Sequence, residues 1–131
     1  MPAPKTPLSD ARPVLMVHTA NRAAALPFWR DVLGLRLLSE NPFAAVFHLQ
    51  GATLRLTDVE GWTPHPHTIL GLEIADIAAA VAALRARGVD FAIYDGFGQD
   101  ADGIWSAPDG RVRIAWFNDP DGNNICLTQT G

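Results

Sequence analysis

The sequence predicts an α+β domain made of two βαβββ modules, and three observations indicate it. Strand-like and helix-like segments follow one another in the same order twice along the chain. In each half the helix follows a residue that favours an N-cap, Asn21 or Asp76. The first strands of the two halves align at a shift of 55 positions, from Val14 to Ile69. One supersecondary unit that occurs twice indicates an internal duplication.

The first half begins with a short apolar strand at Val14–Val17. Asn21 then caps a helix that ends at Gly34. Pro27 predicts a kink in this helix, because proline lacks a backbone N–H and clashes with the preceding turn. Three strand-like runs follow, at Leu35–Leu38, Ala44–Leu49 and Thr53–Asp58.

The second half repeats this order with an insertion. A strand at Ile69–Ile74 precedes an Ala-rich helix at Ile77–Arg87. Arg55 and Cys126 are 71 positions apart rather than 55, so 16 residues are inserted, and we assign them to the Gly- and Asp-rich loop 95–109. The remaining strands are expected at Phe91–Tyr94, Arg111–Phe117 and Asn124–Thr128, the last two joined by a turn at 119–122.

These elements divide the chain into four segments that together form one domain. We expect a flexible leader at 1–11, a first module at 12–60, a Pro-rich linker at 61–67 and a second module at 68–131.

Composition excludes several classes of function. With 48% hydrophobic and 18% charged residues, the 131-residue chain is typical of one globular domain. The net charge of −4, without any Lys/Arg cluster, argues against nucleic acid or a membrane as partner. No apolar run approaches the roughly 20 residues that span a bilayer. The single cysteine, Cys126, excludes an internal disulfide and favours a cytoplasmic location.

Alternation along the strands divides their side chains between two faces. One set is aliphatic and is expected to pack under the helices. The other set is mixed and is expected to face the concave side of the sheet. It comprises Val14, Met16, His18, Thr53, Arg55 and Thr57 in the first half, and Ile69, Gly71, Glu73, Asn124, Cys126 and Thr128 in the second.

Two segments resemble motifs of the vicinal oxygen chelate superfamily, which contains glyoxalase I, extradiol dioxygenases and bleomycin-resistance proteins. Phe117–Leu127, with its Asp-Pro-Asp-Gly turn, resembles the closing motif of that superfamily, and Leu26–Leu35 resembles its first helix and exit turn. The segment 103–110 is most similar to small members without assigned activity. The resemblance, over about residues 12–129, implies eight strands in a curled mixed sheet around a cavity, with helices on the outer face.

The resemblance also implies where a divalent metal would bind. Metal-dependent relatives carry a His, Gln or Glu ligand on the first and last strand of each module, and here those positions are Val14, Arg55, Ile69 and Cys126. Two of these side chains are hydrocarbons, the guanidinium repels a cation, and one thiolate does not make a site. We therefore expect no metal and no other cofactor. Cys126 by itself is expected to be a buried small hydrophobic residue rather than a reactive thiol.

A displaced metal site is the alternative. Alternation gives His67 and His18 the same facing as the family's ligand positions, so a cluster of His18, His67 and Cys126 is conceivable. The opposing interpretation is that His65 and His67 lie on the linker surface and that His18 is a polar residue at the end of its strand.

Arg55 is the cavity residue whose chemistry is most specific. A guanidinium on a half-apolar wall needs a carboxylate partner, for which Glu73 is the candidate, or an anionic group of a ligand. Trp62 and Trp105 lie in predicted loops and can cover the cavity mouth, whereas Trp29 and Trp116 are expected in the core. The full set of expected ligand-binding residues is Met16, His18, Arg55, Thr57, Trp62, Glu73, Trp105 and Cys126.

The leading hypothesis is a metal-independent protein that binds a small organic molecule, planar or amphipathic, with Arg55 as partner for an anionic group. The alternative is a glyoxalase-type lyase or isomerase, or a dioxygenase, with a displaced metal or a His18–Glu73 acid–base pair; a third is an accessory domain without a ligand. No nucleotide-binding glycine motif and no nucleophile elbow is present. A homodimer is expected, because a curled sheet of two modules leaves exposed edges.

Overall fold

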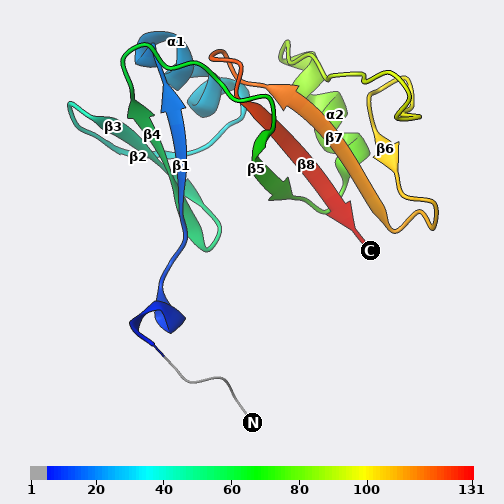
Figure 1. Ribbon diagram of the computed structural model, residues 1–131, viewed down its shortest axis with the longest axis horizontal. Helices are drawn as coiled ribbons and strands as arrows, with labels where there is room; N and C mark the ends of the chain where they lie inside the picture. Colours follow the sequence, from blue (N-terminus) through cyan, green and yellow to red (C-terminus); the bar gives the residue numbers. More distant parts are fainter. Residues whose placement is uncertain (1–5) are drawn as a thin grey trace.

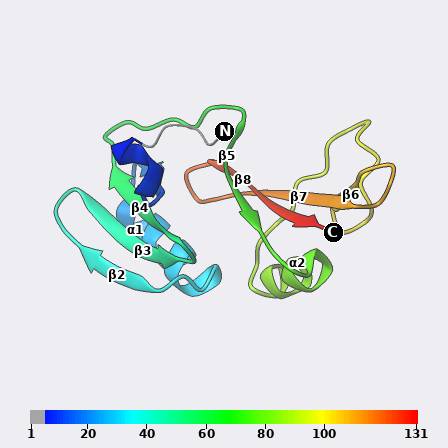
Figure 2. The same cartoon turned by 90° about the horizontal axis from the view of Figure 1, so that it is seen from below.

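The computed structural model describes residues 6–131 and confirms the predicted fold class, an α+β domain of two βαβββ modules. Each module has its own four-stranded mixed sheet, so the eight strands are divided between two sheets. The modules lie side by side in Figures 1 and 2.

The first sheet has the strand order β1-β4-β3-β2. β1 (Val14–Thr19) pairs in parallel with β4 (Ala52–Asp58), which pairs antiparallel with β3 (Ala44–Leu49), which in turn pairs antiparallel with β2 (Leu37–Glu40). One face packs against the fully buried Trp29 through Val17, Phe47, Leu54 and Leu56. The other face is open, and Val14 and Met16 are about half exposed there, at 52% and 54%. The aliphatic set thus lies in the core, as alternation predicts.

Pro27 changes the hydrogen-bonding pattern of the first helix. The Asn21 side chain accepts a hydrogen bond from the Ala24 backbone N–H and caps α1 (Arg22–Pro27), and a π-helical turn, η2 (Phe28–Val32), continues it. The wider turn closes with a 2.9 Å bond from Leu33 N to Phe28 O. The predicted kink is therefore a change from α to π geometry, which needs no N–H at Pro27.

The second sheet has the order β5-β8-β7-β6. β5 (Thr68–Glu73) pairs in parallel with β8 (Asn124–Thr130), and β7 (Val112–Asn118) and the short β6 (Trp105–Ser106) follow antiparallel. The helix α2 (Ile77–Ala86) is capped by Asp76, whose side chain accepts a 3.0 Å bond from Ala79 N. It covers the face that carries the core residues of β7 and β8, and Figure 1 shows it behind these strands.

Two expectations for this module are wrong. Phe91–Tyr94 is not a strand: Phe91 forms only an isolated bridge with Phe117, because the chain turns into a loop held by Gln99. Ile69 does not share the facing of Gly71. The register shifts between Thr68 and Leu70, so Ile69 is the extra residue of a bulge and packs against the core.

A buried polar cluster joins the two modules at the turn between β7 and β8. The Asn123 amide, which is fully buried, donates to the His18 carbonyl at 2.8 Å and to the Asp119 carboxylate at 2.8 Å. Its oxygen accepts a 3.0 Å bond from the Trp62 indole N–H. This cluster connects the end of β1, the linker and the second module, and its residues Asp119 and Asn123 are buried.

A second contact joins the modules at the opposite side. The Arg87 guanidinium, just after α2, donates to the Asp31 and Val32 carbonyls at 3.2 and 3.1 Å. These carbonyls lie at the end of η2, where a cation is favourable. These polar contacts add to an apolar core that is continuous between the modules, in which the ring centroids of Phe28 and Phe117 are 6.3 Å apart.

Residues 1–5 of the expected leader lie outside the described residues. Thr6 caps a short 3-10 turn, Pro7–Asp10, which is exposed and lies beyond the start of β1 (Figure 1). Within residues 6–131, no helix has the length and apolar character that crossing a membrane requires.

Candidate functional site

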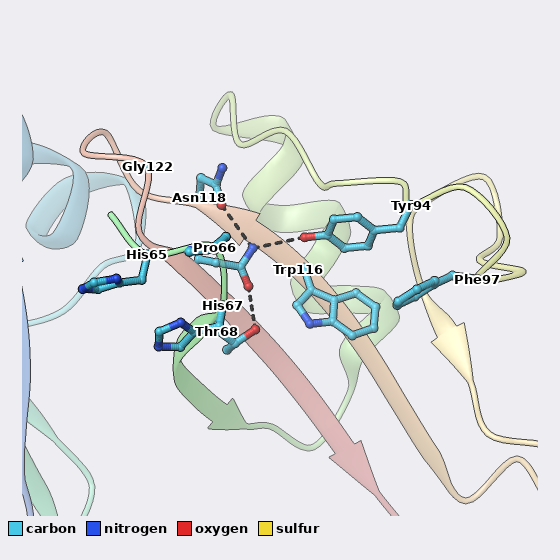
Figure 3. A pocket seen from close by; sticks show the side chains of 10 residues that line it. His65, Pro66, His67, Thr68, Tyr94, Phe97, Trp116, Asn118 and Gly122 are labelled. Atoms are coloured by element: carbon cyan, nitrogen blue, oxygen red, sulfur yellow. Dashed lines mark hydrogen bonds between the residues drawn. The ribbon is translucent and has the colours of Figure 1, made fainter. Parts of the chain in front are cut away.

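A cavity of about 430 Å³ lies on the open face of the second sheet (Figure 3). Its volume falls within the range of small-molecule sites. The strands β7 and β8, the linker and the inserted loop supply its walls. The lining residues are His65, Pro66, His67, Thr68, Tyr94, Phe97, Trp116, Asn118, Gly122 and Asn124.

Three aromatic rings form one wall of this cavity. The ring centroids of Tyr94 and Phe97 are 5.3 Å apart, and those of Tyr94 and Phe97 are 5.7 and 5.9 Å from that of Trp116. Trp116 was expected in the core, and that expectation is wrong. Its register partner Cys126 lies on the open face, so Trp116 faces the cavity and is only half-buried.

The inserted loop positions Tyr94 and Phe97 through one glutamine. The Gln99 amide donates to the carbonyls of Ala92 and Gly103 at 2.8 and 2.7 Å, and its oxygen accepts a 2.7 Å bond from the Tyr94 N–H. One side chain thus replaces the ladder bonds that a strand would supply here. The loop is long enough to bring both rings over Trp116.

The base of the cavity is a network of neutral polar groups centred on Asn124. Its amide nitrogen donates to the Tyr94 hydroxyl at 3.2 Å and to the Asn118 side-chain oxygen at 3.1 Å. Its oxygen accepts a 2.6 Å bond from the Thr68 hydroxyl. In Figure 3 the dashed bonds from the labelled Tyr94, Asn118 and Thr68 run to a common point between the aromatic wall and the linker.

Two histidines form the wall on the linker side. The His65 and His67 rings are stacked, with centroids 5.6 Å apart and an interplanar angle of 27°. Trp62 meets His65 edge-on at 5.7 Å and His18 edge-on at 4.7 Å. A row of four aromatic rings therefore runs from β1 of the first module to the cavity.

Four of the expected ligand-binding residues lie on the open face of the first sheet. Met16 is the register partner of Arg55, and His18 that of Thr57. Arg55 is half-buried and has no ion pair among residues 6–131, and the Thr57 hydroxyl is buried without a hydrogen-bond partner there. Glu73 bonds to the Thr130 hydroxyl, so the alternative Arg55–Glu73 ion pair does not form in this structure.

The other four are divided between the linker and the second sheet. Trp62 is tied into the buried cluster at Asn123 and does not line the cavity, and Glu73 is exposed at the end of β5. Trp105 lies in β6 beside Phe97 and Trp116, where the three line a second, shallower hollow. Cys126 is half-buried, and burial raises the pKa of its thiol above the ordinary 9.0.

The residues at the family's metal positions do not fit a metal. Val14 and Ile69 have no donor atom, Ile69 packs into the core, and Arg55 is a cation. The displaced cluster is not assembled either: within the described part of the chain, no three His, Cys, Asp or Glu side chains are grouped to hold an ion. His18 and His65 each pack edge-on against the Trp62 ring.

Sequence reasoning missed the residues that form most of this cavity. Phe97 lies in the inserted loop and Tyr94 directly before it, and Asn118 and Asn124 flank the turn between β7 and β8. Asn124 was expected on the concave side but was not counted among the ligand-binding residues. Two aromatic residues at the start of a Gly-rich insertion are the signal that could have identified this wall. The pairing of Asn118 with Asn124 across β7 and β8 could have identified the base.

Comparison with known proteins agrees with this architecture. Among solved structures, an antibiotic-binding protein from Streptomyces sp. CB03234, TnmS3, is 26% identical, with a TM-score of 0.70, and the alignment covers 97% of this chain and 100% of that one. A glyoxalase/bleomycin resistance protein/dioxygenase from Nocardioides is 21% identical, with a TM-score of 0.71 and coverage of 98% and 86%. A putative glyoxalase family protein from Bacillus anthracis is 12% identical, with a TM-score of 0.73 and coverage of 93% and 96%.

No curated protein shows significant similarity to the chain. The family model of the Glyoxalase/Bleomycin resistance protein/Dioxygenase superfamily matches residues 13–127, which span most of both modules and the linker between them. The chain therefore belongs to the glyoxalase/bleomycin resistance protein/dioxygenase superfamily.

Proposed function

We propose that this protein binds a small organic molecule, planar or amphipathic, without a metal ion. The observation that carries the proposal is the aromatic and polar cavity formed by Tyr94, Phe97, Trp116 and Asn124. Aromatic walls with a few fixed polar groups are typical of small-molecule sites. Arg55 has no ion pair in the described residues and does not line this cavity; on the open face of the first sheet it is the candidate partner for an anionic ligand group.

Two further observations support binding over metal-dependent catalysis. The donor set at the family's metal positions is unsuitable for a divalent ion, and a relative 26% identical to this chain is an antibiotic-binding protein. The activity of the superfamily's enzymes does not follow from the fold, since one fold supports many functions. The single cysteine is compatible with a reducing, cytoplasmic location for this binding activity.

The expected homodimer belongs to the same proposal. Val14 and Met16 leave apolar surface on the open face of the first sheet, and β1, β2, β5 and β6 each have one strand neighbour in residues 6–131. A second copy would bury the open face and complete the cavity walls. Native mass spectrometry should give twice the monomer mass, and Met16→Glu should shift it to the monomer.

The test of the binding function combines elemental analysis with native mass spectrometry of the untreated protein. We expect a co-purified or added flat organic molecule bound without a stoichiometric divalent ion, and its loss in Trp116→Ala. Phe43→Ala is the matched control, because Phe43 is 71% exposed and does not line the cavity. A stoichiometric metal, together with chelator-sensitive turnover of a methylglyoxal–glutathione adduct, would overturn the proposal in favour of a glyoxalase-type enzyme.

A further inference from the structure

The hydrogen bonds at the base of the cavity leave the hydrogen of the Tyr94 hydroxyl available to a ligand beside the aromatic wall. Both N–H groups of Asn124 are used, since one donates to Tyr94 and the other to Asn118. Its oxygen is occupied by Thr68. Tyr94 and Asn118 therefore act as acceptors toward Asn124, and each keeps its own donor hydrogens.

These donor groups have no other partner in the described residues. The Tyr94 hydroxyl donates to no protein acceptor there, and neither does the Asn118 amide nitrogen, which points away from the Tyr94 hydroxyl in Figure 3. The Tyr94 hydroxyl lies at the edge of the ring wall, beside Trp116. A flat molecule stacked along this wall would bring its own edge to that hydroxyl.

The cavity carries no fixed charge. None of its ten lining residues is Asp, Glu, Lys or Arg. Burying a charged ligand group costs free energy unless a counter-charge meets it. The lining therefore favours an uncharged ligand group at this position.

We propose that the cavity selects a flat, uncharged aromatic group whose edge carries a carbonyl oxygen, as in aryl ketones and quinones. The rings of Trp116 and Phe97 bind the aromatic face, and the Tyr94 hydroxyl donates to the carbonyl. Tyr94 is thus a specificity-determining residue. This inference rests on the proposed function and specifies the ligand class of the same site.

Four tricyclic probes of nearly the same shape test this selectivity. 9-Fluorenone carries a carbonyl, carbazole carries an N–H donor, fluorene carries neither, and 9-oxofluorene-2-carboxylate adds a negative charge. Binding is measured by calorimetry and by quenching of tryptophan fluorescence. One additional neutral hydrogen bond predicts that 9-fluorenone binds about five- to tenfold tighter than fluorene or carbazole. The carboxylate should bind more weakly than 9-fluorenone.

Two variants separate the hydrogen bond from ring stacking. Tyr94→Phe should reduce 9-fluorenone binding to the level of fluorene and leave fluorene binding unchanged. Phe97→Leu keeps the hydroxyl and should weaken all probes by a similar factor. Both residues are exposed in the loop, and circular dichroism checks that each variant folds.

The outcomes distinguish the carbonyl selectivity from the proposed binding function on which it rests. Equal affinity for the four probes, or a preference for 9-fluorenone that survives Tyr94→Phe, overturns the carbonyl selectivity and leaves binding intact. Tightest binding of carbazole also overturns it, because the network would then present acceptors. If none of the probes binds, both the selectivity and the assignment of this cavity as the binding site are wrong.

Discussion

Replacing Asn123 by alanine should destabilise the junction between the two modules more than the loss of one small polar side chain usually does. The Asn123 side chain is fully buried and makes three hydrogen bonds, to His18, Asp119 and Trp62. Alanine leaves a carbonyl, a carboxylate oxygen and an indole N–H without their partner. At about 1–1.5 kcal/mol for each bond, the free energy of unfolding should fall by about 3–5 kcal/mol.

Asn124→Ala is a matched control for this prediction. Asn124 also makes three side-chain hydrogen bonds, but they lie on the open face, where water can replace the lost partner. We expect a loss below about 1 kcal/mol. Both variants remove the same atoms from adjacent positions, so the difference between their free energies of unfolding measures the effect of burying the hydrogen bonds.

Urea unfolding followed by tryptophan fluorescence measures both effects. For Asn123→Ala the urea concentration at the unfolding midpoint should fall, while the dependence of the unfolding free energy on urea concentration stays unchanged. The melting temperature should fall by about 10–20 °C for a chain of this size. Equal losses for the two variants would refute the argument that the buried cluster holds the modules together.

Three further predictions follow from the same structure. Burial raises the pKa of the Asp119 carboxyl above 3.8, although the hydrogen bonds from Asn123 lower it. The stability that the protonated carboxyl contributes is therefore complete below pH 3.8 and is lost as the pH rises through the folded pKa. Urea unfolding from pH 3.5 to 7 should show the stability of the wild type falling relative to Asp119→Asn as the pH rises, and a stability difference of opposite slope would contradict this prediction. The raised pKa of Cys126 predicts that its alkylation rate by iodoacetamide, followed by mass spectrometry, rises with pH to a midpoint above 9.0, and a midpoint below that value would show a stabilised thiolate. Gly122→Ala should destabilise the fold by about 1–3 kcal/mol more than Gly51→Ala, because both glycines have positive φ but only at Gly122 would the new Cβ come within 3.0 Å of Pro64; equal melting temperatures would mean that Pro64 moves aside without cost.

Local signals in the sequence were sufficient for most secondary structure of the first module. The strand expected at 44–49 matches β3, and the helix caps at Asn21 and Asp76 form as expected, because capping and alternation depend on near neighbours. The prediction was wrong where hydrogen bonds from a side chain replace the pairing of a strand. Phe91–Tyr94 has strand-forming residues, but Gln99 supplies hydrogen bonds that hold this segment as a loop.

The candidate site divides in the same way. The sequence alone indicated which side chains of β1 and β4 share a face, and it excluded suitable metal ligands at Val14 and Arg55, since both follow from residue type and period. Only the tertiary structure placed Trp116 at a cavity rather than in the core, because that depends on which face of the sheet the helix α2 covers. The meeting of Tyr94 with Asn124 likewise depends on a contact between residues 30 positions apart, which no local pattern encodes.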